Sequence, residues 1–236
     1  MTSESSDSPR DDIAHAGRIG FWVAIILAVL LGLHPPGSTE LYGDGGAFLE
    51  HIDGFWIAIH IAVAVLLFVI PLVVGVWASH LATPKARVYG GLATYAAIGG
   101  AAVGVIHLVG IDTMTFVAFS DTFESGAGSE AVLVGADILL RIHAATLAAW
   151  ALSFFFVLPV SAGIAAIADG RYPVWYWLLL LVAGAAALSG VIVAFGEGQW
   201  SDLSETVLLR VSGVLAIAWI LITSWWMRKG STAPAP

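Results

Sequence analysis

The segment that decides the fold is FWIAIHIAVAVLLFVIPLVVGVWAS, residues 55–79. Its one ionisable side chain is His60, and a helix of about 20 apolar residues is long enough to cross the hydrocarbon core of a bilayer. Five further segments have the same character. The sequence therefore predicts an all-α, polytopic integral membrane protein, a bundle of six transmembrane helices. The predicted spans are residues 19–33, 55–79, 88–110, 136–168, 173–195 and 204–227.

The composition supports this fold class. Of the 236 residues, 59% are hydrophobic and 11% are charged, whereas about a quarter of the residues in a soluble domain are charged. The mean hydropathy is +0.91. We predict a disordered cytoplasmic tail at 1–18, a transmembrane domain at 19–229 and a second disordered tail at 230–236.

The residue types also exclude several classes of site and partner. The chain has no cysteine, which excludes disulfides, thiolate metal ligands and cysteine nucleophiles. Its few basic residues form no clustered basic face, which argues against nucleic acid as a partner. The expected partners are the lipid bilayer, a small-molecule or lipid-like ligand, and a membrane partner subunit.

The basic residues are segregated to one side of the predicted bundle. The three loops of the opposite side, residues 34–54, 111–130 and 196–204, contain no Lys or Arg. Because positively charged loops stay on the cytoplasmic side, we predict a cell (cytoplasmic) membrane protein with both termini in the cytoplasm. The basic residues that carry this argument are Arg10, Arg18, Lys85, Arg87, Arg171, Arg228 and Lys229.

Ionisable side chains gather at the outer ends of four predicted helices. Such groups are costly at membrane depth unless they are paired, so each is a candidate for a functional site. Counting residues from the helix ends places all of them at one level and predicts an outward-facing polar cluster. Its candidate members, whether they bind a ligand or form ion pairs, are His60, His107, Asp112, Asp137, Arg141, His143, Glu197, Glu205 and Arg210.

Helical phase divides the residues of the fourth span. Asp137 and Arg141 are four residues apart and share a face, so they can pair; a plain ion pair that fixes helix register is an equal interpretation. His143 is turned by about 200° from Arg141. Since arginine is the costlier group in lipid, we predict that Arg141 faces the interior and His143 a neighbouring helix or subunit. No functional role is expected for the histidines of the tail and loops, which are His15, His34, His51 and His80.

The favoured functional interpretation is a pocket that opens outward. It would bind a small or lipid-like ligand, and guanidinium groups suit an anionic one; alternatively, the protein supports a membrane complex. Enzymatic activity is not the favoured expectation, because the sequence contains no recognised catalytic motif. The recognition groups of this pocket would be Arg141, Arg210, His60 and His107.

Two other interpretations use the histidines as ligands. A b-type haem or quinone-binding electron-transfer subunit would take axial ligands from His60, His107 and His143. A metal-dependent membrane enzyme would place the same three histidines and Asp112 around zinc or iron. All three interpretations stay open at the level of sequence.

Proline and glycine mark local features of the spans. Pro71 predicts a kink in the second span, and Gly100 with Gly104 predicts close helix packing in the third. The fourth apolar segment is longer than a bilayer requires. It must therefore either project past the membrane at its leading end or bend at Pro159.

A family resemblance rests on three short patterns: Trp56-x3-His60, Leu139-Leu-Arg-Ile-His143 and Trp200-x3-Ser204-Glu205. Over about residues 19–228 the chain is similar to uncharacterised six-helix prokaryotic membrane proteins of the DUF4386 type. The resemblance implies the same six-helix architecture, and it brings no activity, cofactor or site residue with it.

Overall fold

The computed structural model describes residues 9–34, 54–113, 130–198 and 200–233. Every regular element in these ranges is helical, and six helical runs are long and apolar enough to cross a membrane, which confirms the predicted fold class. The runs are Asp11–Leu33, Gly54–Ser79, Pro84–Thr113, Val132–Asp169, Val174–Glu197 and Leu203–Arg228.

Four of the six runs are divided into shorter helical segments, three of them by a π-helical segment. The first run is α1 (Pro9–Leu33) and the fifth is α10 (Val174–Glu197). The second consists of α4 (Gly54–Leu67) and α5 (Ile70–Ser79), and the third of α6 (Pro84–Val105) and the π-helical segment η1 (Ile106–Thr113). The remaining segments are α8 (Glu130–Trp150), η2 (Ala151–Val157), α9 (Leu158–Asp169), η3 (Asp202–Leu209) and α11 (Arg210–Arg228).

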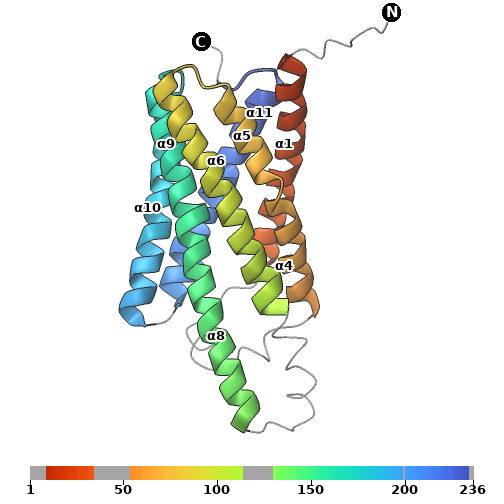
Figure 1. Cartoon of the computed structure of the whole chain (residues 1–236), viewed down its shortest axis with the longest axis vertical. Helices are drawn as coiled ribbons and strands as arrows, with labels where there is room; N and C mark the ends of the chain where they lie inside the picture. The colour runs from red at the N-terminus through yellow and green to blue at the C-terminus, as the bar shows by residue number, and fades with distance from the viewer. Residues whose placement is uncertain (1–8, 35–53, 114–129, 199, 234–236) are drawn as a thin grey trace, which may run out of the picture.

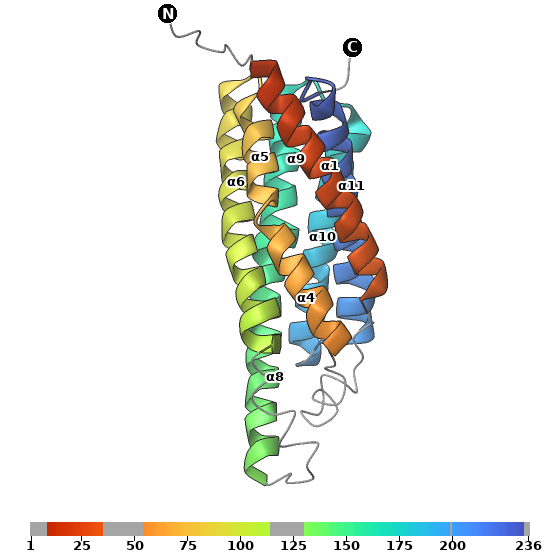
Figure 2. The same cartoon turned by 90° about the vertical axis from the view of Figure 1, so that its right-hand side faces the viewer.

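The helices form one elongated bundle whose two ends differ in charge (Figure 1). The start of α1, the turns α5–α6 and α9–α10, and the end of α11 lie together at one end, which we call the basic end. It carries Arg18, Lys85, Arg87, Arg171, Arg228 and Lys229. At the other end, α8 projects beyond its neighbours (Figure 2). The long fourth segment therefore projects at its leading end, one of the two predicted solutions.

The outward surface of the bundle is apolar. Large side chains such as Phe68, Tyr95 and Phe195 are 65%, 75% and 73% exposed. A water-soluble bundle would place polar residues there. This surface suits contact with lipid and supports an integral membrane protein.

Small residues allow the helices to approach closely. A Cβ added at Gly17 of α1 would lie 2.6 Å from the backbone carbon of Met227 in α11. A Cβ at Gly100 or Gly104 of α6 would lie 2.7 Å from atoms of Phe154 or Trp150, respectively. The predicted role of the Gly100/Gly104 pair in close packing is confirmed.

Prolines interrupt the spans and release carbonyl groups. A proline has no backbone N–H and collides with the carbonyl four residues earlier. Pro71 accordingly follows a break between Leu67 and Ile70, which confirms the predicted kink. Four residues before Pro159 lies Phe155, whose carbonyl oxygen accepts a hydrogen bond from Ser212 Oγ at 3.3 Å.

Both predicted tails are shorter than expected. The α1 helix begins at Pro9, and its first turns bury Ile13 and Ala16 in the core. These two apolar contacts explain why residues 9–18 are helical instead of forming a tail. At the other terminus, the Tyr172 hydroxyl donates a hydrogen bond to the buried Thr232 backbone oxygen at 2.8 Å, so residues 230–233 pack against the bundle. The rest of each predicted tail, and most of the first outer loop, lie outside the described residues.

Candidate functional site

Three histidines and one aspartate converge in the half of the bundle opposite the basic end. His60 comes from α4, His107 and Asp112 from η1, and His143 from α8, and none is more than 3% exposed. The i→i+5 bonding of a π-helix brings residues five apart onto one face. In a regular α-helix, His107 and Asp112 would be turned about 140° apart. The wide turns of η1 are thus what places both residues in the site.

Asp112 is the centre of this group and is fully buried. Its Oδ1 atom accepts a hydrogen bond from Nδ1 of His143 at 2.7 Å. Its Oδ2 atom accepts no hydrogen bond within the described residues and lies 3.5 Å from Nε2 of His60. A buried carboxylate oxygen is costly unless it is compensated, so this atom calls for a proton, a hydrogen-bond donor or a cation.

The backbone determines the tautomer of His60. Its Nδ1 atom lies 2.7 Å from the carbonyl oxygen of Trp56, one helical turn earlier. A carbonyl only accepts hydrogen bonds, so Nδ1 carries the proton. In the neutral imidazole, Nε2 is then an acceptor, and it lies 3.3 Å from His34 Nε2 and 3.5 Å from Asp112 Oδ2. The Trp56 ring packs on the imidazole, with ring centroids 3.6 Å apart, and holds its orientation.

Thr146 determines the tautomer of His107 in the same way. The Thr146 hydroxyl donates to the carbonyl oxygens of Ile142 and His143, each at 3.0 Å. Since its proton is used there, its oxygen accepts from Nδ1 of His107 at 3.0 Å. The Nε2 atom of neutral His107 therefore carries a lone pair as well. Such partners on the second ring nitrogen are typical of metal-binding histidines.

The spacing of these atoms is compatible with a metal ion. In a tetrahedral site with bonds of about 2.0–2.2 Å, ligand atoms are about 3.4 Å apart. The 3.5 Å between His60 Nε2 and Asp112 Oδ2 matches this value. His107, Asp112 and His143 each offer a ligand atom, and these three atoms lie within 4.8 Å of one another.

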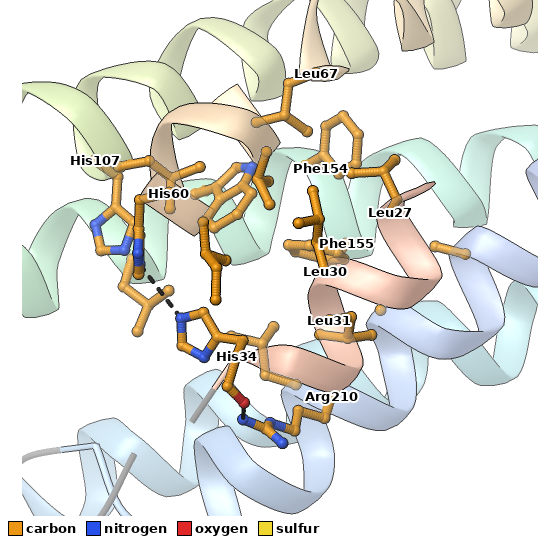
Figure 3. Close-up of a pocket in the computed structure, with 18 of the residues that line it drawn as sticks. Leu27, Leu30, Leu31, His34, His60, Leu67, His107, Phe154, Phe155 and Arg210 are labelled. Carbon is orange, nitrogen blue, oxygen red and sulfur yellow. Dashed lines mark hydrogen bonds between the residues drawn. The ribbon is translucent and has the colours of Figure 1, made fainter. Parts of the chain in front are cut away.

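A cavity of about 160 Å³ adjoins the histidines. It lies among α1, α4, α8 and α11, and the histidines occupy one end of it (Figure 3). Two charged residues, Arg210 and Glu205, also line it. The rest of the wall is mainly apolar and includes Leu27, Leu30, Val63, Leu67, Phe154 and Ile220.

His34, at the end of α1, joins the histidine cluster to the sixth span. Its Nε2 atom lies 3.3 Å from Nε2 of His60, and its carbonyl oxygen accepts a hydrogen bond from Arg210 Nη2 at 2.7 Å (Figure 3). No functional role was predicted for His34, and the structure places it on the wall of the cavity, at the end of α1. Trp56 and Thr146 are further contributors that sequence reasoning did not name.

The other histidines set aside in the sequence are not in the site, as far as the structure describes them. His15 is exposed on α1. His80 lies at the basic end, where its Nδ1 contacts the carbonyl oxygen of Val76 at 2.8 Å. His51 lies outside the described residues.

The structure reverses the predicted orientation of the fourth span. Arg141 and His143 do lie on different faces, but His143 is buried in the site and Arg141 is exposed, as is Asp137. A neutral imidazole costs less to bury than a guanidinium. A long arginine near a helix end can instead keep its charged group in a polar environment.

The remaining predicted residues divide between the cavity and the surface. Glu205 and Arg210 line the cavity together with His60 and His107. Glu197 is exposed at the end of α10. The predicted cluster is thus separated into a buried histidine–aspartate group, the half-buried Glu205 and Arg210 at the cavity, and a set of exposed charges.

No protein-family model, curated protein or solved structure matches this chain.

Proposed function

We propose that this protein is an integral membrane metalloprotein that binds one divalent transition-metal ion. The ligands would be His107, His143 and Asp112, whose ligand atoms lie within 4.8 Å of one another, with His60 as a fourth at 3.5 Å from Asp112 and His34 adjacent. The observation that supports the proposal is the buried Asp112 carboxylate, whose Oδ2 atom has no hydrogen-bond partner within the described residues and lies 3.5 Å from His60 Nε2.

Two electron-rich atoms at that distance repel each other unless a cation lies between them. A proton on His60 would satisfy that single contact. A metal ion would also use the Nε2 lone pair of His107, which Thr146 holds in the ligand tautomer. One ion thus compensates the Asp112 carboxylate and uses both imidazoles.

The donor types favour a particular class of metal. Imidazole suits zinc, copper, iron and nickel, whereas magnesium and calcium prefer oxygen ligands. The chain has no cysteine, so no thiolate favours copper(I). Histidines with one carboxylate are the ligands of catalytic zinc and of non-haem iron(II). We therefore assign the site to zinc or iron(II).

The basic end supports an orientation for this centre. The segregation of Lys and Arg supports an orientation with that end, and both termini, in the cytoplasm. The histidine cluster lies in the opposite half and hence toward the outer face of the cell membrane. The resemblance to proteins of the DUF4386 type remains a prediction and adds no chemistry.

The same contacts favour a metal ion over haem. A haem with two histidine ligands needs an imidazole on each side of its macrocycle. The ring centroids of His107 and His143 are 4.4 Å apart, and His143 contacts Asp112 directly. These contacts leave no room for a macrocycle between the two imidazoles.

A cobalt(II) titration tests the proposal, because tetrahedral Co²⁺ reports its ligands by visible absorption. The purified protein should bind one Co²⁺ per chain, and zinc should displace it. Asp112→Asn and His107→Gln should weaken binding at least tenfold, in line with the loss of a ligand. The matched control is His80→Gln, a histidine at the basic end.

Helical circular dichroism and gel-filtration elution show whether each variant folds. The proposal fails if the folded wild-type protein binds no Co²⁺ saturably, or if Asp112→Asn binds as tightly as His80→Gln. An intense Soret band in the purified protein would overturn it in favour of haem.

A further inference from the structure

We propose that the cavity beside the histidine cluster binds a small, uncharged, apolar molecule of about the size of benzene. The cavity inference stands on the shape and lining of the bundle. Only the position of the ligand, next to the metal ion, rests on the proposed function.

The size of the cavity sets the size of the ligand. Well-packed interiors contain few voids larger than a water molecule. This cavity measures about 160 Å³, and an apolar cavity of about 150 Å³ in another protein binds benzene or xenon. A ring of six carbons is therefore the appropriate scale.

The lining sets the polarity of the ligand. Most of the wall consists of aliphatic side chains and aromatic rings. One indole donor that lines it, Trp150 Nε1, has no hydrogen-bond partner within the described residues, so an uncharged ligand could still accept one hydrogen bond there. The two charged lining residues, Glu205 and Arg210, have opposite signs, and Arg210 already donates to the His34 carbonyl oxygen. Their formal charges sum to zero, so over most of its apolar wall the pocket suits an uncharged molecule.

The long axis of the cavity places the ligand relative to the metal. The sixth span lines it from Arg210 to Ile220, a rise of about 15 Å along an α-helix. The histidines lie at the Arg210 end, and Leu67 and Ile220 line the deeper part. A ligand in this space would have one end against the metal and the other among aliphatic side chains.

Gly213 offers a variant that fills the cavity without disturbing the bundle. It is buried in α11 and lines the cavity, and a Cβ there would meet Leu31 and Phe155 at ordinary distances of 3.7 and 3.8 Å. Gly213→Leu therefore keeps its first carbon in allowed contact and extends into the open space. Gly99→Leu is the matched control, because Gly99 is exposed on α6 and a Cβ there meets nothing within 4 Å.

Fluorobenzene binding, followed by ¹⁹F NMR in lipid nanodiscs, tests the inference. The wild-type protein and Gly99→Leu should show a saturable bound resonance, one per chain, distinct from probe dissolved in lipid. Gly213→Leu should weaken binding at least tenfold while its helical content stays unchanged. Loading with paramagnetic Co²⁺ should broaden the bound resonance and leave the lipid resonance unchanged.

Each failure identifies a different error. If the protein binds Co²⁺ but shows no saturable resonance, the cavity inference is wrong and the proposed function stands. If the probe binds in Asp112→Asn and in wild type but Co²⁺ binds neither, the proposed function is wrong and the cavity inference stands. A bound resonance that Co²⁺ leaves sharp overturns the position beside the metal. Binding in detergent but not in nanodiscs overturns the small-molecule ligand in favour of a lipid acyl chain.

Discussion

Replacing Gly100 by alanine should destabilise the bundle, whereas the same change at the neighbouring Gly99 should not. A Cβ at Gly100 would lie 2.7 Å from Cβ and 3.0 Å from Cα of Phe154. Carbon atoms normally pack at about 3.5–4.0 Å, so α6 and η2 must separate by roughly 1 Å. Rotation of the Phe154 ring cannot relieve a contact with these atoms. Overpacking of this kind costs about 1–3 kcal/mol.

The control variant measures the opposing effect of helix propensity. Removing a glycine from a helix interior stabilises it by about 0.5–1 kcal/mol, and Gly99→Ala should show that gain alone because its Cβ meets open space. Gly100→Ala should thus be less stable than Gly99→Ala by about 1–3 kcal/mol. Reversible unfolding in mixed micelles measures the difference. Equal stability of the two variants would refute the close approach of α6 and η2.

Three further predictions concern the metal ligands, the turn between α9 and α10, and the topology. Thr146→Val removes the partner of His107 Nδ1 and should weaken metal affinity about 10–100-fold, while Thr146→Ser restores it; an unchanged affinity in the Co²⁺ titration would contradict the assigned tautomer. Burial raises the pKa of the Tyr172 phenol, so its contribution to stability is complete below about pH 10 and declines as the pH rises further. Thermal unfolding should consequently depend less steeply on pH between pH 9 and 11 in Tyr172→Phe than in wild type. Identical slopes would show that Tyr172 does not contribute to this pH dependence. Because the chain has no cysteine, an impermeant maleimide should label Gly196→Cys in intact cells and Lys85→Cys only after permeabilisation; the reverse pattern would invert the topology.

The six spans could be predicted because each is a long apolar run, and only a helix satisfies its own backbone in lipid. The ends of the spans were less predictable. Residues 9–18 are polar on average, yet Ile13 and Ala16 find apolar partners and make them helical. Composition does not reveal contacts between residues that are far apart in the sequence.

The site could be predicted only in part, since its geometry departs from a regular α-helix. His60 and His107 were identified by their depth in the spans, and both line the cavity. The pairing of His107 with Asp112 depends on the π-helical turns of η1, which an α-helical phase does not reproduce. His34 was assigned to a loop, and only the packing of α1 against α11 brings it to His60.

The predicted orientation of the fourth span was wrong for an energetic reason. Arg141 was expected inside the bundle because a guanidinium group is costly in lipid. A neutral histidine with a carboxylate partner, here Asp112, costs less free energy to bury. The prediction that Arg141 and His143 lie on different faces was correct. The prediction that Arg141 is the one facing the interior was wrong.

The metal content of the protein, purified without a histidine tag, tests the central claim most directly. Elemental analysis of wild-type protein should find about one zinc or iron ion per chain, and Asp112→Asn should retain far less. His80→Gln should match the wild type. Wild-type protein that holds no stoichiometric metal, and that takes up none when zinc or iron(II) is supplied, would contradict the assignment of the histidine–aspartate group as a metal centre.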